Sequence, residues 1–130
     1  MKKVLLANLF FVIISFACFS EEYNQMRNFD QYPSKYVLYP TTNNWIFIKL
    51  DTETGKLWMI QYSVNDDESR GTFDISTKDL SVNKTRVKGR FKLYPTKNMY
   101  TFIMLDTIDG SAYQVQWSTD NNVGVWTIKN

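Results

Sequence analysis

An internal duplication is the feature of this 130-residue sequence that most constrains its fold. A shift of 55 residues, which takes Tyr36 to Phe91, aligns residues 36–63 with residues 91–118 without a gap. Roughly half of the aligned residues are identical, among them the segments Leu-Tyr-Pro-Thr and Leu-Asp-Thr. A shared polar–apolar pattern does not require identity at this level, so we interpret the two segments as copies of one structural unit.

Each copy has the pattern of four short β-strands. In the first copy, runs rich in aromatic and β-branched residues at 45–50 and 57–64 flank the segment from Asp51 to Gly55, which is typical of a tight hairpin turn. The first strand is predicted at 36–39 and the fourth at 72–75, with 125–128 as its counterpart. The sequence therefore predicts an all-β fold of two tandem, pseudo-equivalent four-stranded antiparallel units, which form a small barrel or sandwich.

Alternation along the strands assigns side chains to two faces, and we assign the same faces in both copies. Those predicted to face the core are Trp58, Ile60, Tyr62, Phe73 and Ile75 in the first copy, and Tyr113, Val115, Trp117, Trp126 and Ile128 in the second. Those predicted on the wetter face are Met59, Gln61 and Ser63, matched by Gln114, Gln116 and Ser118. Tyr39 and Tyr94 are predicted to point away from the face of Leu38 and Leu93.

The N-terminus has the pattern of an export signal over residues 1–20. Lys2 and Lys3 precede an uncharged apolar run at 4–17, which is short for a transmembrane helix and typical of a signal peptide. Two kinds of processing fit this segment. A signal peptidase could cut after Ser20, or Cys18 could become a lipidated N-terminus as in bacterial lipoproteins.

We divide the rest of the chain into a lead-in at 21–34, repeat unit 1 at 35–76, a basic connector at 77–89 and repeat unit 2 at 90–130. About 110 residues are enough for one hydrophobic core, so the two units are expected to form a single domain. The connector is interpreted as a solvated link or a protected edge strand, with a basic docking patch as the alternative.

Charge and cysteine content limit the possible partners. Without Lys2 and Lys3, the 15 basic residues fall to 13 and equal the 13 acidic ones, so no net field attracts nucleic acid. Cys18 is the only cysteine, so the predicted mature domain has no disulfide. We expect a bacterial envelope protein that is periplasmic or secreted.

Catalytic motifs are missing from the sequence. There is no histidine, no CxxC pair and no glycine-rich phosphate loop. Asp51 and Asp106 recur in both copies, but at hairpin entrances where Asp forms turns. The acidic run at 66–68 is not kept in the second copy, at 120–122. We therefore expect no enzyme activity, no cofactor and no metal site.

Six residues are candidate binding residues because both copies keep them at positions predicted on loops or on the wetter face. They are Tyr39, Asn43, Gln61, Tyr94, Asn98 and Gln116. Aromatic and amide side chains give contact area and adaptable hydrogen bonds without charge. The alternative interpretation is structural, with the Asn side chains capping a turn and the Gln side chains pairing across the sheet.

The sequence is most consistent with an exported, non-enzymatic binding or inhibitor protein of the immunity type in the bacterial cell envelope, whose partner is a protein or a glycan. The alternative is a glycan-binding surface lipoprotein module. A small hydrolase would require carboxylates to converge in a cleft. The oligomeric state is left open.

Overall fold

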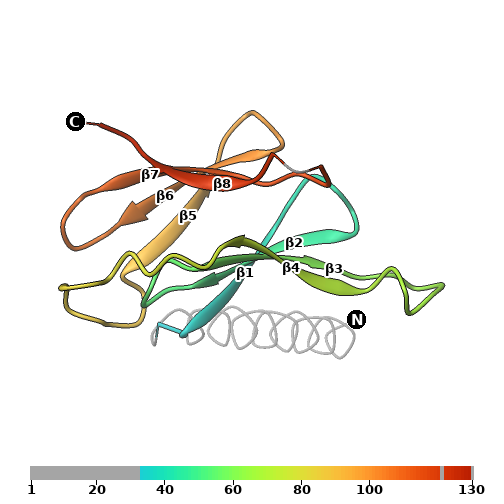
Figure 1. The fold of residues 1–130 in the computed structure, drawn as a ribbon, viewed down its shortest axis with the longest axis horizontal. Helices are drawn as coiled ribbons and strands as arrows, with labels where there is room; N and C mark the ends of the chain where they lie inside the picture. The colour runs from blue at the N-terminus through green and yellow to red at the C-terminus, as the bar shows by residue number, and fades with distance from the viewer. Residues whose placement is uncertain (1–32, 121, 130) are drawn as a thin grey trace, which may run out of the picture. The chain divides into compact units, whose positions relative to one another are not determined.

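The computed structural model describes residues 33–120 and 122–129, and this part of the chain is all-β (Figure 1). The predicted signal peptide at 1–20, with Cys18, and the lead-in up to residue 32 lie outside the described residues. The strands form two four-stranded antiparallel sheets, each with its strands in chain order, and the described residues form no closed barrel. No helix among them has the length and apolar character that a membrane span requires.

The two sheets correspond to the two sequence copies. Sheet 1 consists of β1 (Tyr36–Pro40), β2 (Ile46–Asp51), β3 (Leu57–Gln61) and β4 (Gly71–Ser76). Sheet 2 consists of β5 (Phe91–Pro95), β6 (Thr101–Asp106), β7 (Ala112–Gln116) and β8 (Gly124–Thr127). Their registers match, since Tyr36 lies opposite Asp51 and Phe91 lies opposite Asp106. The prediction of two four-stranded antiparallel units is confirmed.

The repeated Asp and Gly residues build the hairpin turns, as predicted. Oδ1 of Asp51 accepts a hydrogen bond of 3.0 Å from the amide of Glu53, and Gly55 has a φ of 74°. In the second copy, Oδ1 of Asp106 accepts from the amide of Ile108 at 3.0 Å, and Gly110 has a φ of 78°. A positive φ is available to glycine without a steric cost, which explains why this position is kept.

The two sheets bury opposite faces of the repeated unit. In sheet 2 the face predicted to be inward is buried, with Tyr113, Val115 and Trp117 in the core. In sheet 1 the buried face is the one predicted to be wet. Its buried side chains, which join those of sheet 2 in one hydrophobic cluster, are Ile46, Ile48, Leu50, Leu57 and Met59.

The prediction that Trp58, Ile60 and Tyr62 face the core is therefore wrong. Trp58 and Ile60 are half-buried and Tyr62 is exposed, because these side chains lie on the outer face of sheet 1. Strand alternation fixes which residues share a face, but the neighbouring sheet decides which face is covered. The two units share one sequence pattern but are covered on opposite faces, so a single face assignment cannot hold for both.

The predicted exposure is also wrong for side chains of β1 and of the fourth strands. Tyr39, predicted on a loop or the wetter face, packs against the core, and Leu38 is exposed. In β5 the arrangement is the opposite, since Leu93 is buried and Tyr94 is exposed. The fourth strands differ too: Ile75 is buried, but the side chains predicted beside it or at its counterpart positions are exposed, namely Phe73, Trp126 and Ile128. Val125 packs against the core in place of Trp126.

Hydrogen bonds from the backbone amides of Gly89 and of β5 join this segment to sheet 1. The amide of Phe91 donates to the carbonyl of Thr52 at 2.9 Å, and the amide of Gly89 donates to the Thr52 hydroxyl at 3.0 Å. The amide of Leu93 donates to the phenol oxygen of Tyr39 at 3.3 Å. The two sheets therefore meet through polar contacts at one margin in addition to the shared core.

Two of the four basic residues of the connector, Lys84 and Arg86, form ion pairs with carboxylates, and so does Arg90 at the start of repeat unit 2. Lys84 lies 2.5 Å from Asp109 and 3.3 Å from Asp106, and Arg90 lies 2.9 Å from Asp106. Arg90 and Asp106 are 3% and 0% exposed, so this ion pair is buried. Pairing with Asp109 raises the pKa of Lys84, and Lys84 in turn holds the pKa of Asp109 below its ordinary value. These contacts fasten the connector to the hairpin of sheet 2.

Candidate functional site

The six predicted binding residues do not form one site. Asn43 and Gln61 line the same hollow beside sheet 1. Tyr39 contacts the core, while Tyr94 is 47% exposed on the outer face of sheet 2. Asn98 borders a separate shallow hollow near Pro40 and Pro95, and Gln116 lies half-buried on the outer face of sheet 2.

The two asparagines have a structural role that accounts for their duplication. Oδ1 of Asn43 accepts a hydrogen bond of 2.9 Å from the amide of Trp45, and Oδ1 of Asn98 accepts one of 2.9 Å from the amide of Tyr100. The hydroxyl of Thr41 closes the same loop by donating to the carbonyl of Ile46 at 2.8 Å. These are the side-chain-to-backbone bonds that stabilise turns, in agreement with the capping interpretation.

Tyr39 also has a structural role. Its ring packs against the core, and its oxygen accepts the hydrogen bond from Leu93 between the sheets. Burial raises the pKa of Tyr39, so the phenol stays protonated and uncharged at neutral pH. Of the predicted residues, Gln61 and Asn43 are left as the pair that a ligand could contact together.

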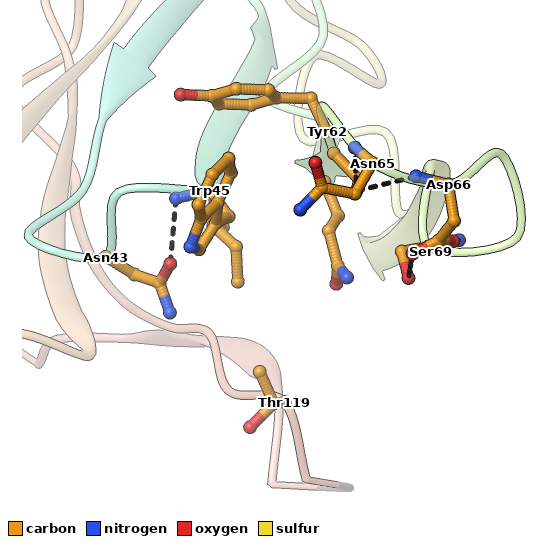
Figure 2. Close-up of a pocket in the computed structure, with 10 residues that line it drawn as sticks. Asn43, Trp45, Tyr62, Asn65, Asp66, Ser69 and Thr119 are labelled. Atoms are coloured by element: carbon orange, nitrogen blue, oxygen red, sulfur yellow. Dashed lines mark hydrogen bonds between the residues drawn. The ribbon is translucent and has the colours of Figure 1, made fainter.

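We call the concave surface around Gln61 the Gln61 groove. It consists of two adjoining hollows of about 330 Å³ and 310 Å³, which share Gln61 and Thr119. The first hollow, shown in Figure 2, is lined by Asn43, Trp45, Ile46, Gln61, Tyr62, Ser63, Asn65, Asp66, Ser69 and Thr119. The second is lined by Met59, Gln61, Phe73, Asp74, Ile75, Ser118, Thr119, Asp120 and Val123.

An aromatic pair forms one wall of the first hollow. The rings of Trp45 and Tyr62 lie 5.4 Å apart at an angle of 58°, and both side chains are exposed (Figure 2). The hydroxyl of Tyr62 donates to the carbonyl of Asn44 at 2.8 Å, and the cap from Asn43 fixes the backbone of Trp45. The backbone of Trp45 is therefore fixed by Asn43, and its indole packs against the ring of Tyr62.

A polar loop forms the opposite wall. Oγ of Ser63 accepts from the amide of Asp66 at 3.4 Å, and Asp66 in turn accepts from the amide and hydroxyl of Ser69 at 2.7 and 2.9 Å. Nε of Arg70 donates to the carbonyl of Ser63 at 3.0 Å and closes the loop at its base. Thr119, from the loop between β7 and β8, lies at the lower edge of the hollow in Figure 2.

The groove offers hydrogen-bonding groups but no basic side chain. Its lining contains amides, hydroxyls and the carboxylates of Asp66, Asp74 and Asp120, together with apolar surface from Trp45 and Phe73. Within residues 33–120 and 122–129, no three His, Cys, Asp or Glu side chains lie close enough to hold a metal ion. The arrangement can bind an uncharged polar ligand, or a positively charged one, through contact area and hydrogen bonds.

Sequence reasoning missed several of the groove residues. Trp45 belongs to the strand run at 45–50 and is not among the candidate binding residues, and Phe73 is predicted to face the core. Thr119 carried no signal of its own, because it enters the groove only when the two sheets pack together. The one available signal was the aromatic residue that both copies keep two positions after the capping asparagine, Trp45 and Tyr100.

Comparisons of this chain with protein-family models, with curated proteins and with solved structures found no match.

Proposed function

We propose that this chain is a non-enzymatic binding protein of the bacterial cell envelope, and that it holds a glycan in the Gln61 groove. The observation that carries the proposal is the position of Trp45: its exposed indole packs against the ring of Tyr62 and lines the same hollow as Gln61, and this hollow has no basic side chain in its lining. In this proposal the two sheets pack as a sandwich, and the groove lies between sheet 1 and the loop that joins β7 to β8.

The chemistry of the groove matches that of a sugar ring. A sugar has an apolar face, which packs on an aromatic ring, and hydroxyls that both donate and accept hydrogen bonds. The amide of Gln61 offers a donor and an acceptor within one side chain. The hydroxyls of Ser63 and Thr119 add the same dual capacity on the other sides of the hollow.

The duplication supplies matched controls for a binding test. Trp45→Ala and Gln61→Ala alter the groove, and Tyr100→Ala and Gln116→Ala make the same kind of change at the equivalent positions of the second copy. Calorimetric titration with oligosaccharides released from bacterial cell walls should show affinity that falls at least about tenfold in the groove variants and persists in the controls. Equal losses in all four variants, or no binding by the wild type, would count against the proposal.

An inhibitor of an envelope protein is the second candidate. Asp66, Asp67 and Glu68 form an exposed acidic loop at the rim of the groove, and like-signed rim charges steer an oppositely charged partner. A pull-down from envelope extract compares this candidate with the glycan. Capture of one basic protein at a stoichiometric level, weakened by charge reversal at Asp67 and unaffected by cell-wall oligosaccharide, favours the inhibitor.

Export is part of the proposal and rests on the sequence alone. The mass of the mature protein distinguishes the two kinds of processing. A chain that begins at Glu21 indicates cleavage after Ser20, and a diacylglyceryl group on Cys18 indicates a surface lipoprotein.

A further inference from the structure

The buried face of sheet 2 and the outer face of sheet 1 are the same face of the repeated unit. The outer face of sheet 1 carries Tyr36, Leu38, Phe47, Lys49, Trp58, Ile60 and Tyr62. A shift of 55 residues turns this set into Phe91, Leu93, Phe102, Met104, Tyr113, Val115 and Trp117, all of which are buried in the core. Sheet 1 thus exposes a version of the surface that sheet 2 buries.

The converse relation holds for the other pair of faces. The outer face of sheet 2 carries Lys92, Tyr94, Thr101, Ile103, Leu105, Ala112, Gln114 and Gln116. Their equivalents in sheet 1 are Val37, Tyr39, Ile46, Ile48, Leu50, Leu57, Met59 and Gln61, which lie on its inner face. The contact inside the chain therefore joins two different faces of one unit.

Because the internal contact joins unlike faces, each chain still has one uncovered copy of each face. These are the outer face of sheet 1 and the outer face of sheet 2. Such a heterologous contact can repeat from molecule to molecule, whereas a contact between like faces closes on itself. We propose that copies of this chain associate head to tail, with the outer face of sheet 2 of one copy packed on the outer face of sheet 1 of the next. The contact would repeat the one already present inside each chain.

The outer face of sheet 1 already has the local geometry of its buried counterpart. The rings of Tyr100 and Trp117 lie 5.3 Å apart at 58°, and those of Trp45 and Tyr62 lie 5.4 Å apart at 58°. Nε1 of Trp117 donates to the carbonyl of Met99, and the hydroxyl of Tyr62 donates to the equivalent carbonyl of Asn44. Trp117 is fully buried under sheet 1, whereas Tyr62 is 41% exposed.

Polar groups at the margin are also repeated. Inside the chain the Leu93 amide donates a hydrogen bond to the Tyr39 phenol. The residue equivalent to Leu93 is Leu38, which is 55% exposed on β1, and the residue equivalent to Tyr39 is Tyr94. In a head-to-tail pair, the amide of Leu38 in one copy would face the phenol of Tyr94 in the other. The Thr52 carbonyl that accepts from Phe91 likewise has its equivalent in Thr107.

Substitutions on the outer faces make the proposed contact weaker than the internal one. On sheet 2, Lys92 and Gln114 stand where sheet 1 has Val37 and Met59, so that surface is more polar. On sheet 1, Lys49 stands at the position of Met104 and lies 4.5 Å from the ring of Trp58. Burying charged groups reduces affinity, so the association is expected to be reversible and concentration-dependent.

Sedimentation equilibrium with purified protein tests the proposal. The wild type should show an average mass that rises with concentration. Leu38→Lys disables the sheet 1 face and Tyr94→Lys disables the sheet 2 face, and each should weaken self-association at least about tenfold. Val82→Lys, at an exposed residue of the connector outside both faces, is the matched control and should behave as the wild type.

A mixture of the two variants separates head-to-tail packing from other arrangements. Each variant keeps one intact face, and the two faces are complementary, so an equimolar mixture should form a heterodimer that neither variant forms alone. Unchanged melting temperatures show that the variants fold; if either is lowered, Tyr36→Lys and Gln114→Lys alter the same faces at exposed residues.

Three results would overturn the proposal. The wild type could remain monomeric up to about 1 mM, where even a weak contact is populated. Self-association could survive Tyr94→Lys, which would indicate that sheet 1 faces pair with each other. The mixture could contain no heterodimer, which would show that the surfaces are covered by some other part of the chain or by another protein.

Discussion

The amide of Leu93 donates a hydrogen bond of 3.3 Å to the phenol oxygen of Tyr39, from β5 of one sheet to β1 of the other. The equivalent tyrosine of the second copy, Tyr94, lies on the opposite side of its sheet and is exposed. Identical residues at equivalent positions thus have different surroundings, because the two sheets bury opposite faces of the repeated unit.

This difference gives a prediction for the two tyrosines. Tyr39→Phe should lower the free energy of unfolding by about 1 kcal/mol, since it leaves the ring in place and removes one partly buried hydrogen bond. Tyr94→Phe should change it by less than about 0.5 kcal/mol, as is usual for an exposed position. Urea unfolding of dilute protein measures both values. Equal effects would mean that the bond between the sheets contributes nothing measurable.

The buried ion pair between Arg90 and Asp106 gives a second prediction. Arg90→Met should destabilise the fold by about 3 kcal/mol, because removal of one partner leaves a buried charge without its closest counterion. Lys84 remains 3.3 Å from Asp106, which keeps the cost at the low end of the usual range for such pairs.

The duplication again supplies the control for this variant. Lys35 occupies the position equivalent to Arg90, lies 3.9 Å from Glu53 and is partly exposed. Lys35→Met should cost less than about 1 kcal/mol, as expected for an exposed ion pair. Thermal and urea unfolding of both variants give the comparison, and similar losses would show that burial of Arg90 is not the cause.

The sequence predicted the strands and turns because these depend on local chemistry. The turn at Gly55 needs a positive φ and a nearby Asp, and the four strands follow from short runs of aromatic and β-branched residues. The buried faces depend on which sheet covers which, and this information lies in no single strand. Trp58 and Tyr113 are aligned aromatic residues, yet one is half-buried on an outer face and the other is in the core.

The candidate site was predictable only in part. Retention of Asn43 and Asn98 suggested a binding role, but their side chains cap turns that both copies need. Gln61 belongs to the groove, whereas Gln116 lies on an outer face. The groove itself forms where the loop before β4 comes close to Thr119 in the loop between β7 and β8, and no pattern within either segment indicates that they meet.

The contact between Lys84 and Asp109 gives a prediction for acid unfolding. Lys84 holds the pKa of Asp109 below its ordinary value of 3.8, so the ionised carboxylate stabilises the folded chain above about pH 4. This contribution is lost as the pH falls from about 4 towards the lower pKa of the folded state.

Lys84→Met should therefore flatten the fall in stability below pH 4. Two effects leave a residual slope in the variant. The pKa of Asp79 is lowered mainly by its hydrogen bond from Ser81 and also by Arg86. The bond from the Ser111 amide still lowers the pKa of Asp109. Urea midpoints measured from pH 7 to pH 2 provide the test. An identical slope in the variant and the wild type would show that Lys84 does not interact with Asp109 in solution.

The two hairpin glycines give the last prediction, because the repeat places them in different surroundings. Both have a positive φ, so Gly110→Ala should cost about 1 kcal/mol from backbone strain alone. A Cβ at Gly110 would meet no atom within 4 Å, whereas one at Gly55 would lie 3.0 Å from the side chain of Leu80.

Gly55→Ala should therefore cost more than Gly110→Ala, by about a further 1 kcal/mol, since Leu80 must shift to make room. The double variant Gly55→Ala with Leu80→Ala tests this cause directly: removal of the leucine side chain should abolish the extra cost relative to Leu80→Ala alone. If both glycine variants lose the same stability in urea, Leu80 moves aside without a measurable cost, and its contact with the first hairpin does not stabilise the fold.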